Sequence, residues 1–218
     1  MTDQTSGTTP EPLDKAPGPP QKTPGPPQKS PELVEGPIVL VGPPSSGKST
    51  IGRALAERLG AVFVDVDAVI EERAGKPIGE IFATDGEPAF RELETTTTIQ
   101  TLTELSTSAA TAPDPANPAV VSLGGGAVTS AEIRAALAPY RVVWLRVGIA
   151  AAAERIGLNT ARPLLLGNVR GQLIKLMRER EPMYAEVATI SLATDHQEPT
   201  ALVELIIEQL PGLQPTQP

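Results

Sequence analysis

Five short apolar runs recur along the chain, and segments with helical periodicity lie between them. Runs of near-continuous apolar character, rich in β-branched residues, are typical of strands that are buried on both faces. The predicted strands are residues 38–41, 61–64, 120–123, 141–147 and 188–192. Because strands and helices alternate, we expect an α/β domain with a five-stranded parallel sheet and helices on both of its faces.

The segments between these runs carry apolar residues three and four positions apart, the spacing of one face of a helix. The predicted helices are residues 51–59, 69–74, 87–105, 130–137, 150–155, 172–180 and 198–210. The third of them contains four consecutive threonines, Thr95–Thr98, which are poor helix formers. We interpret the threonine run as a tolerated surface feature.

Three segments do not follow this pattern. Residues 1–36 are rich in proline, contain two copies of Pro-Gly-Pro-Pro-Gln-Lys and have almost no large apolar side chain. Such a composition predicts a disordered tail with polyproline II character, a solvated segment rather than a ligand for a proline-reading domain. Residues 106–118 and 157–171 are predicted loops. The folded domain is therefore expected over residues 37–218.

Composition narrows the classes of function. The formal net charge of −8 argues against nucleic acid or an anionic membrane as a partner. The absence of cysteine and the single histidine, His196, exclude thiolate and multi-histidine metal sites. No apolar run approaches the length of a membrane span, and no hydrophobic signal segment opens the chain. A cytoplasmic protein is the default expectation.

The strongest motif lies between the first predicted strand and the first predicted helix. Residues 42–50 read Gly-Pro-Pro-Ser-Ser-Gly-Lys-Ser-Thr and match the phosphate-binding P-loop. Backbone N–H groups of such a loop and of the following helix bind an anion. Lys48 would reach the β- and γ-phosphates of a nucleotide, and the Ser49 hydroxyl would hold Mg²⁺.

Other candidate residues follow the second and third predicted strands. Asp65 and Asp67 come after the second strand, and Gly124–Gly126 come after the third. Carboxyl ends of parallel strands meet at one edge of the sheet, where ligands bind. If the second strand continues far enough, both carboxylates share a face, one for Mg²⁺ and one to accept a proton. The alternatives are N-cap or turn aspartates and a flexible glycine turn.

Three arginines, Arg91, Arg162 and Arg180, complete the set of candidates. A single arginine is usually a solvated surface charge. An acidic protein that handles anions nevertheless needs some arginines that face the ligand, and their forked guanidinium groups suit carboxylate and phosphate.

With these residues in place, the chain resembles shikimate kinases from about residue 38 to residue 210. The motifs that carry the resemblance are GxxxxGKST-IGR at 42–53, Asp-x-Asp at 65–67, IFATDGEPAFRELE at 81–94, SLGGGAV at 122–128 and Arg-Pro-Leu at 162–164. The resemblance implies the fold of nucleoside monophosphate kinases, with a mobile lid at about 157–171, and a monomer. It also implies transfer of the γ-phosphoryl group of MgATP to the 3-hydroxyl of shikimate, a step toward chorismate and the aromatic amino acids.

The resemblance assigns roles residue by residue. Asp67 would bind the shikimate hydroxyls and act as the base, Arg91 and Arg180 would hold the shikimate carboxylate, and Arg162 would reach the transferred phosphate from the lid. Ser49 and Asp65 would manage Mg²⁺. The remaining residues implied to contact ATP or the shikimate ring are Gly42, Ser45, Ser46, Gly47, Lys48 and Thr50 in the P-loop, Arg155 near the adenine, and Gly124, Gly125 and Gly126.

Two departures from the family pattern bear on the nucleotide. The family usually has glycine where this chain has Ser45, and it often has arginine in the stretch that here reads Asp195-His196-Gln197-Glu198-Pro199. Two alternative functions remain open from the sequence. One is another small-molecule kinase of this fold, such as a gluconate kinase, and the other is a catalytically inactive nucleotide-binding or scaffold module that interacts through the proline-rich tail.

Overall fold

A computed structural model describes residues 36–109, 118–155, 169–210 and 212–213. The predicted tail, most of the predicted lid and the centre of the predicted 106–118 loop lie outside these ranges. Within them, no helix combines the length and the apolar character needed to cross a bilayer.

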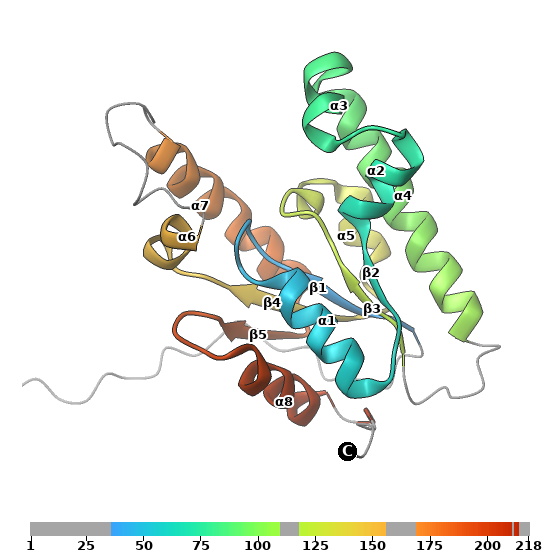
Figure 1. The fold of residues 1–218 in the computed structure, drawn as a ribbon, viewed down its shortest axis with the longest axis vertical. Coiled ribbons are helices and arrows are strands. Elements are labelled where there is room, and N and C mark those ends of the chain that lie inside the picture. The colour runs from blue at the N-terminus through green and yellow to red at the C-terminus, as the bar shows by residue number, and fades with distance from the viewer. Residues whose placement is uncertain (1–35, 110–117, 156–168, 211, 214–218) are drawn as a thin grey trace, which may run out of the picture.

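The five predicted strands form one parallel sheet. They are β1 (Ile38–Val41), β2 (Phe63–Asp65), β3 (Val120–Ser122), β4 (Arg141–Arg146) and β5 (Ile190–Ala193). Their order is β2-β3-β1-β4-β5, and every neighbouring pair is parallel. The sheet places β1 at its centre, so the segment after β1 emerges between the segments that follow β3 and β4 (Figure 1).

Helices cover both faces of this sheet, which confirms the predicted fold class (Figure 1). Their bounds are α1 (Lys48–Leu59), α2 (Val66–Ala74), α3 (Ile78–Thr84), α4 (Gly86–Ala109), the short 3-10 helix η1 (Ala127–Thr129), α5 (Ala131–Ala136), α6 (Ile149–Arg155), α7 (Val169–Val187) and α8 (Pro199–Gln209).

Alternation along β1 divides the core into two layers. Ile38 and Leu40 pack with apolar residues of α1 and α8, whereas Val39 and Val41 pack with apolar residues of α2, α4, α5 and α7. All four side chains are almost fully buried, as expected for a central strand covered on both faces. Burial of this strand fixes the start of the loop that follows it.

The threonine run was misread from the sequence. Thr97 and Thr98 are 1% and 0% exposed, and Thr101, one turn later, is 5% exposed. The second half of the run therefore faces the protein interior, whereas Thr95 is half-buried and Thr96 is exposed. Packing of threonine methyl groups against the core overrides their low helix propensity, because most helical stability in proteins comes from tertiary contacts.

Two boundaries differ in a way that affects the site. β2 ends at Asp65 instead of continuing, because the Asp65 carboxylate accepts a hydrogen bond from the Asp67 N–H (3.2 Å) and caps α2. Asp67 therefore lies in the first turn of α2, and the expectation of two carboxylates on one strand face is wrong. The helix predicted at 172–180 is longer, Val169–Val187, with Pro182 in its interior.

Candidate active site

The loop between β1 and α1 is shaped by residues with positive φ. Gly42 has φ 154°, and a Cβ there would overlap the carbonyl oxygen of Leu145 in β4. Gly47, with φ 91°, precedes the first residue of α1. Ser45 also has a positive φ of 60°, a left-handed conformation that costs a side-chain-bearing residue free energy. Position 45 thus adopts the left-handed conformation that favours glycine, although it is a serine.

Lys48 folds back over this loop. Its Nζ donates hydrogen bonds to the carbonyl oxygens of Gly42 (2.9 Å) and Pro43 (3.0 Å). Desolvation lowers the pKa of Lys48 to about 8, and the negative charges of Asp67 and Asp65 counteract part of that shift. An anionic ligand in the loop would restore the charged form of this side chain, because an opposite charge nearby favours ionisation.

Ser49 and Asp65 are brought together from α1 and the end of β2. The Ser49 hydroxyl donates to Asp65 Oδ2 at 2.7 Å, while the other carboxylate oxygen caps α2. Asp65 is thus both an N-cap and a neighbour of the P-loop, so the two readings of this residue from the sequence are compatible.

The three consecutive glycines after β3 bring the acceptor-side candidates together. A Cβ on Gly124 would lie 2.7 Å from both Asp67 Oδ1 and Glu94 Oε1, and one on Gly126 would overlap the Arg91 guanidinium. A Cβ on Gly125 would come within 2.9 Å of Pro44 Cδ in the P-loop. A side chain at Gly125 would meet the backbone and ring of Pro44, and one at Gly124 or Gly126 would displace the ends of Asp67, Glu94 or Arg91, so close approach explains the glycines better than a flexible turn does.

Asp67 is held in an environment that favours its neutral form. Burial, helped by the negative charges of Asp65, Glu94 and Glu71 and opposed by Lys48, raises the pKa of Asp67 to about 6. A carboxyl with a pKa this close to neutrality is suited to exchange a proton with a ligand hydroxyl.

Arg91 is positioned by two carboxylates of its own helix. Its Nη1 donates to Glu94 Oε2 at 2.7 Å, and its Nη2 donates to Glu87 Oε1 at 3.0 Å. Glu94 is 2% exposed on its side chain, whereas Glu87 is 64% exposed. The ion pair with the buried Glu94 therefore fixes the direction of the Arg91 guanidinium.

Arg180 reaches the same glycine loop from α7. Its Nη1 donates to the Gly125 carbonyl oxygen at 2.9 Å, and the Tyr184 hydroxyl donates to that oxygen at 2.6 Å. Burial raises the pKa of Tyr184 to about 12, so this hydroxyl keeps its proton and remains a donor. Asp67, Arg91 and Arg180 therefore lie around one loop, although they come from three helices.

The nucleotide-side candidates lie around a second space at the other side of the P-loop. A cavity of about 280 Å³ is lined by Ser46, Gly47, Thr50, Ile51, Arg155, Thr194, Gln197, Pro199 and Leu202. Arg155 donates to the carbonyl oxygens of Ser45 (3.1 Å) and Thr194 (2.7 Å). In residues 195–199, which differ from the family pattern, both carboxylate oxygens of Asp195 accept a hydrogen bond from the Gly148 N–H. Gln197 of the same stretch lines the cavity.

Two residues of this arrangement escaped the sequence analysis, and one candidate cannot be placed. Glu94 follows Arg91 by three positions, and Tyr184 follows Arg180 by four, so each shares a helix face with the arginine that it supports. That spacing was a signal that could have identified both. Arg162 lies outside the described residues.

Comparison with known proteins gives a consistent family. A family model described as Shikimate kinase matches residues 44–211, most of the chain. The chain is 49% identical over 174 residues to a shikimate kinase of Thermobifida fusca, covering 80% of this chain and 94% of that protein. It is 50% identical over 173 residues to one of Saccharopolyspora erythraea, with 79% and 92% coverage.

Solved structures agree with this result. The shikimate kinase from Acinetobacter baumannii, determined in complex with shikimate, superimposes with a TM-score of 0.65 and 34% sequence identity. The superposition covers 78% of this chain and 90% of that protein. The family model, the sequence relatives and the solved structure all indicate the same family. The chain therefore belongs to the shikimate kinase family.

Proposed function

We propose that this chain transfers the γ-phosphoryl group of ATP to the 3-hydroxyl of shikimate. The observation that carries the proposal is the convergence of Asp67, Arg91 and Arg180 on Gly124–Gly126, next to a P-loop whose Pro44 lies against Gly125. The loop supplies a site for a triphosphate, and the neighbouring side chains supply a site for a small hydroxy acid. The family's activity needs these two sites side by side.

Arg91 and Arg180 would bind the carboxylate of the acceptor. Arg91 is already oriented by Glu94 and Glu87, and Arg180 is held on the Gly125 carbonyl, so little side-chain entropy is lost on binding. Guanidinium groups bind carboxylates through two parallel hydrogen bonds, which fixes the ring of the acceptor as well as attracting it.

Asp67 would accept the proton of the attacking hydroxyl. With a pKa of about 6 it is mostly ionised at neutral pH, yet it binds a proton more readily than an ordinary aspartate does. Once the hydroxyl is deprotonated, its oxygen attacks the γ-phosphorus of ATP. The bond between that phosphorus and the oxygen that bridges it to the β-phosphate breaks, and ADP leaves. Lys48 would offset the charge on the phosphoryl oxygens, and Arg162 is proposed to assist from the segment outside the described residues.

Ser49 and Asp65 fit a magnesium ion. A hydroxyl and a carboxylate 2.7 Å apart beside the P-loop are oxygen donors of the kind that Mg²⁺ takes, directly or through water. Among the described residues no cluster of three or more metal-binding side chains occurs, which suits an ion that is held mainly by phosphates and water. When bound, the ion neutralises charge on the nucleotide phosphates.

A coupled assay of ADP release tests the proposal. ADP should form in the presence of Mg²⁺ and shikimate and should fall to background without shikimate, and gluconate should not replace it. Turnover with gluconate alone would support the sugar-acid kinase alternative. ATP binding without any acceptor-dependent turnover would support the inactive nucleotide-binding module. The monomeric state, the cytoplasmic location and the solvated tail stay predictions from the sequence.

A further inference from the structure

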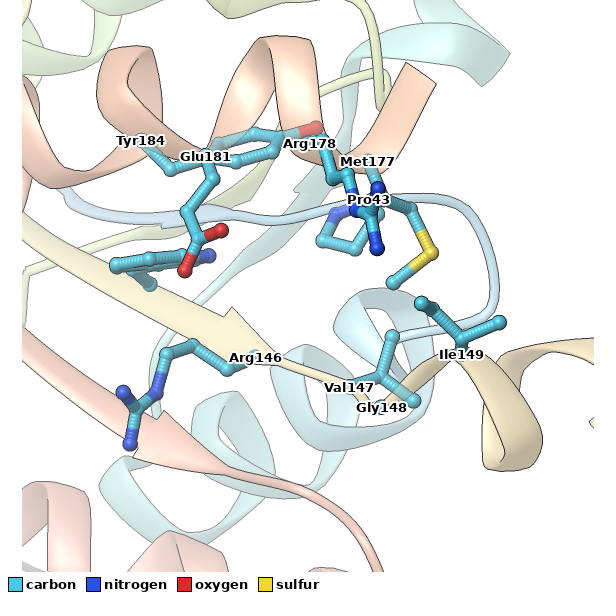
Figure 2. A pocket seen from close by; sticks show the side chains of 10 residues that line it. Pro43, Arg146, Val147, Gly148, Ile149, Met177, Arg178, Glu181 and Tyr184 are labelled. Atoms are coloured by element: carbon cyan, nitrogen blue, oxygen red, sulfur yellow. The ribbon is translucent and has the colours of Figure 1, made fainter. Parts of the chain in front are cut away.

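A second cavity lies between α7 and the junction of β4 with α6. Its volume is about 280 Å³, and it is lined by Pro43, Trp144, Arg146, Val147, Gly148, Ile149, Met177, Arg178, Glu181 and Tyr184. Figure 2 shows Met177, Arg178 and Glu181 on the α7 side and Val147 and Ile149 opposite them. Asp67, Arg91 and Arg180 are not among these residues, but Tyr184 and Pro43 are, so the cavity adjoins the proposed acceptor site and extends away from its charged groups.

Two opposite charges of α7 face this space without neutralising each other. Arg178 and Glu181 are three positions apart, as are Arg91 and Glu94, which form an ion pair of 2.7 Å. Within the described part of the chain, neither Arg178 nor Glu181 has an ion-pair or hydrogen-bond partner. Figure 2 shows both side chains descending from α7 into the cavity, whereas the guanidinium of Arg146 points away from it.

One residue of the cavity lining, Trp144, also carries a buried donor without a partner among the residues that the structure describes. Trp144 is 5% exposed, and its indole Nε1 has no hydrogen-bond partner among the described residues. A buried polar group left without a partner destabilises the fold, because it has lost its hydrogen bonds to water. A ligand that supplies an acceptor oxygen to this N–H would offset part of that destabilisation.

The rest of the wall is apolar. Pro43, Val147, Ile149 and Met177 present aliphatic surface, and the ring of Trp144 stacks against that of Tyr184 at 5.9 Å between centroids. The volume is just below the usual range for ligand pockets, about 300–1,000 Å³, so the occupant must be small. It needs a cationic end, an anionic end with acceptor oxygens, and an apolar body.

We propose that this cavity binds a free α-amino acid with an apolar side chain. Glu181 binds the ammonium group, Arg178 and the Trp144 N–H bind the carboxylate, and the aliphatic wall contacts the side chain. The two charges of such a ligand are joined through a single carbon, which matches two side chains that converge from adjacent turns of one helix. A monofunctional acid or amine would satisfy only one of the two α7 charges.

Trp144 provides the measurement, because it is the chain's only tryptophan and it lines the cavity. L-Leucine, its deaminated analogue isocaproate and its decarboxylated analogue isoamylamine are titrated into the full-length protein, with tryptophan fluorescence and calorimetry as readouts. We expect a saturable response to leucine that is stronger than the response to either analogue. Absence of a saturable signal for leucine in both readouts would overturn the proposal.

Three variants on α7 test the assignment of each charge. Arg178→Gln should weaken the binding of leucine and of isocaproate about two- to fivefold, the size expected for an exposed ion pair, and should leave the binding of isoamylamine unchanged. Glu181→Gln should weaken the binding of leucine and of isoamylamine by a similar factor and leave the binding of isocaproate unchanged. Lys175→Gln is the matched control, because Lys175 is on the same helix but does not line the cavity. Equal leucine affinity in all three variants contradicts the proposed site.

Discussion

The two halves of the active site are built in different ways. The P-loop half comes from one continuous segment, residues 42–50, and consists mainly of backbone groups whose positions follow from the buried strand β1 and from positive-φ residues. The acceptor half consists of side chains from α2, α4 and α7 that meet around Gly124–Gly126. A continuous backbone site can be read from a motif, whereas a site assembled from distant helices needs the fold.

This difference predicts where substitutions act. Changes in the P-loop half should affect phosphoryl transfer with every acceptor, because the proposed role of the loop is to bind the nucleotide. Changes in the acceptor half should affect the binding or the phosphorylation of the acceptor and leave nucleotide binding nearly unchanged.

Lys48→Met should have the largest effect. It removes the one side-chain cation of the P-loop, and we expect kcat to fall by at least about 10³-fold, comparable to the loss of a charge-stabilising donor. The fold should persist, because within the described residues the hydrogen bonds of Lys48 go to loop carbonyls alone. Steady-state kinetics and circular dichroism check both points. A variant with full activity would remove Lys48 from phosphoryl transfer.

Asp67→Asn comes next, with an expected fall in kcat of about 10²–10³-fold from loss of the base. For the unsubstituted chain, kcat/KM should fall as pH decreases through about 6, where Asp67 becomes protonated. A pH profile without this limb would argue against Asp67 as the base.

The same variant should be more stable than the parent. Because the folded-state pKa of Asp67 is raised from 3.8 to about 6, ionisation of this group destabilises the fold as pH rises across that interval. At neutral pH, without Mg²⁺ or nucleotide, Asp67→Asn should gain roughly 1–2 kcal/mol of unfolding free energy after allowance for solvent screening. Below pH 3.8 the gain should vanish. Urea denaturation at both pH values measures it.

Arg91→Ala should raise the KM for shikimate about 10- to 100-fold while the KM for ATP changes little. Alanine would leave the buried Glu94 carboxylate without its cation, so the substitution is best made in a Glu94→Gln background. Comparison with Glu94→Gln alone isolates the arginine. Equal changes in the KM values of both substrates would contradict the carboxylate role.

Ser45→Gly should have the smallest effect. Glycine relieves the left-handed strain at φ 60° but adds entropy to the unfolded chain, so we expect a net stabilisation of about 0.5–1 kcal/mol. Chemical denaturation measures it, and kcat should be nearly unchanged. Destabilisation would show that the serine side chain contributes to the loop.

These contrasts also explain what the sequence could predict. The five parallel strands and the helices on both faces of the sheet follow from apolar runs and helical spacing, and the P-loop follows from its motif. The strand order β2-β3-β1-β4-β5 was not predicted and comes from the structure. The end of β2 at Asp65 depends on a capping hydrogen bond, which competes with strand continuation and leaves no periodic signal. The burial of Thr97 and Thr98 depends on which face of α4 is turned toward the protein interior, and propensity does not encode that choice.

The supporting residues were missed for a related reason. Glu94 and Tyr184 act on Arg91 and on the Gly125 carbonyl, respectively, so neither has a motif of its own. Their helical spacing from the two arginines becomes informative only once those arginines are known to face inward.

The contact between Pro44 and Gly125 brings the P-loop and the glycine loop together. One partner is a rigid ring and the other has no side chain at all, so the two loops approach as closely as backbone allows. Alanine at position 125 would act as a spacer between the halves and lengthen the path that the phosphorus atom travels. The short distance between the two loops thus depends on a hydrogen atom, the smallest substituent that an α-carbon can carry.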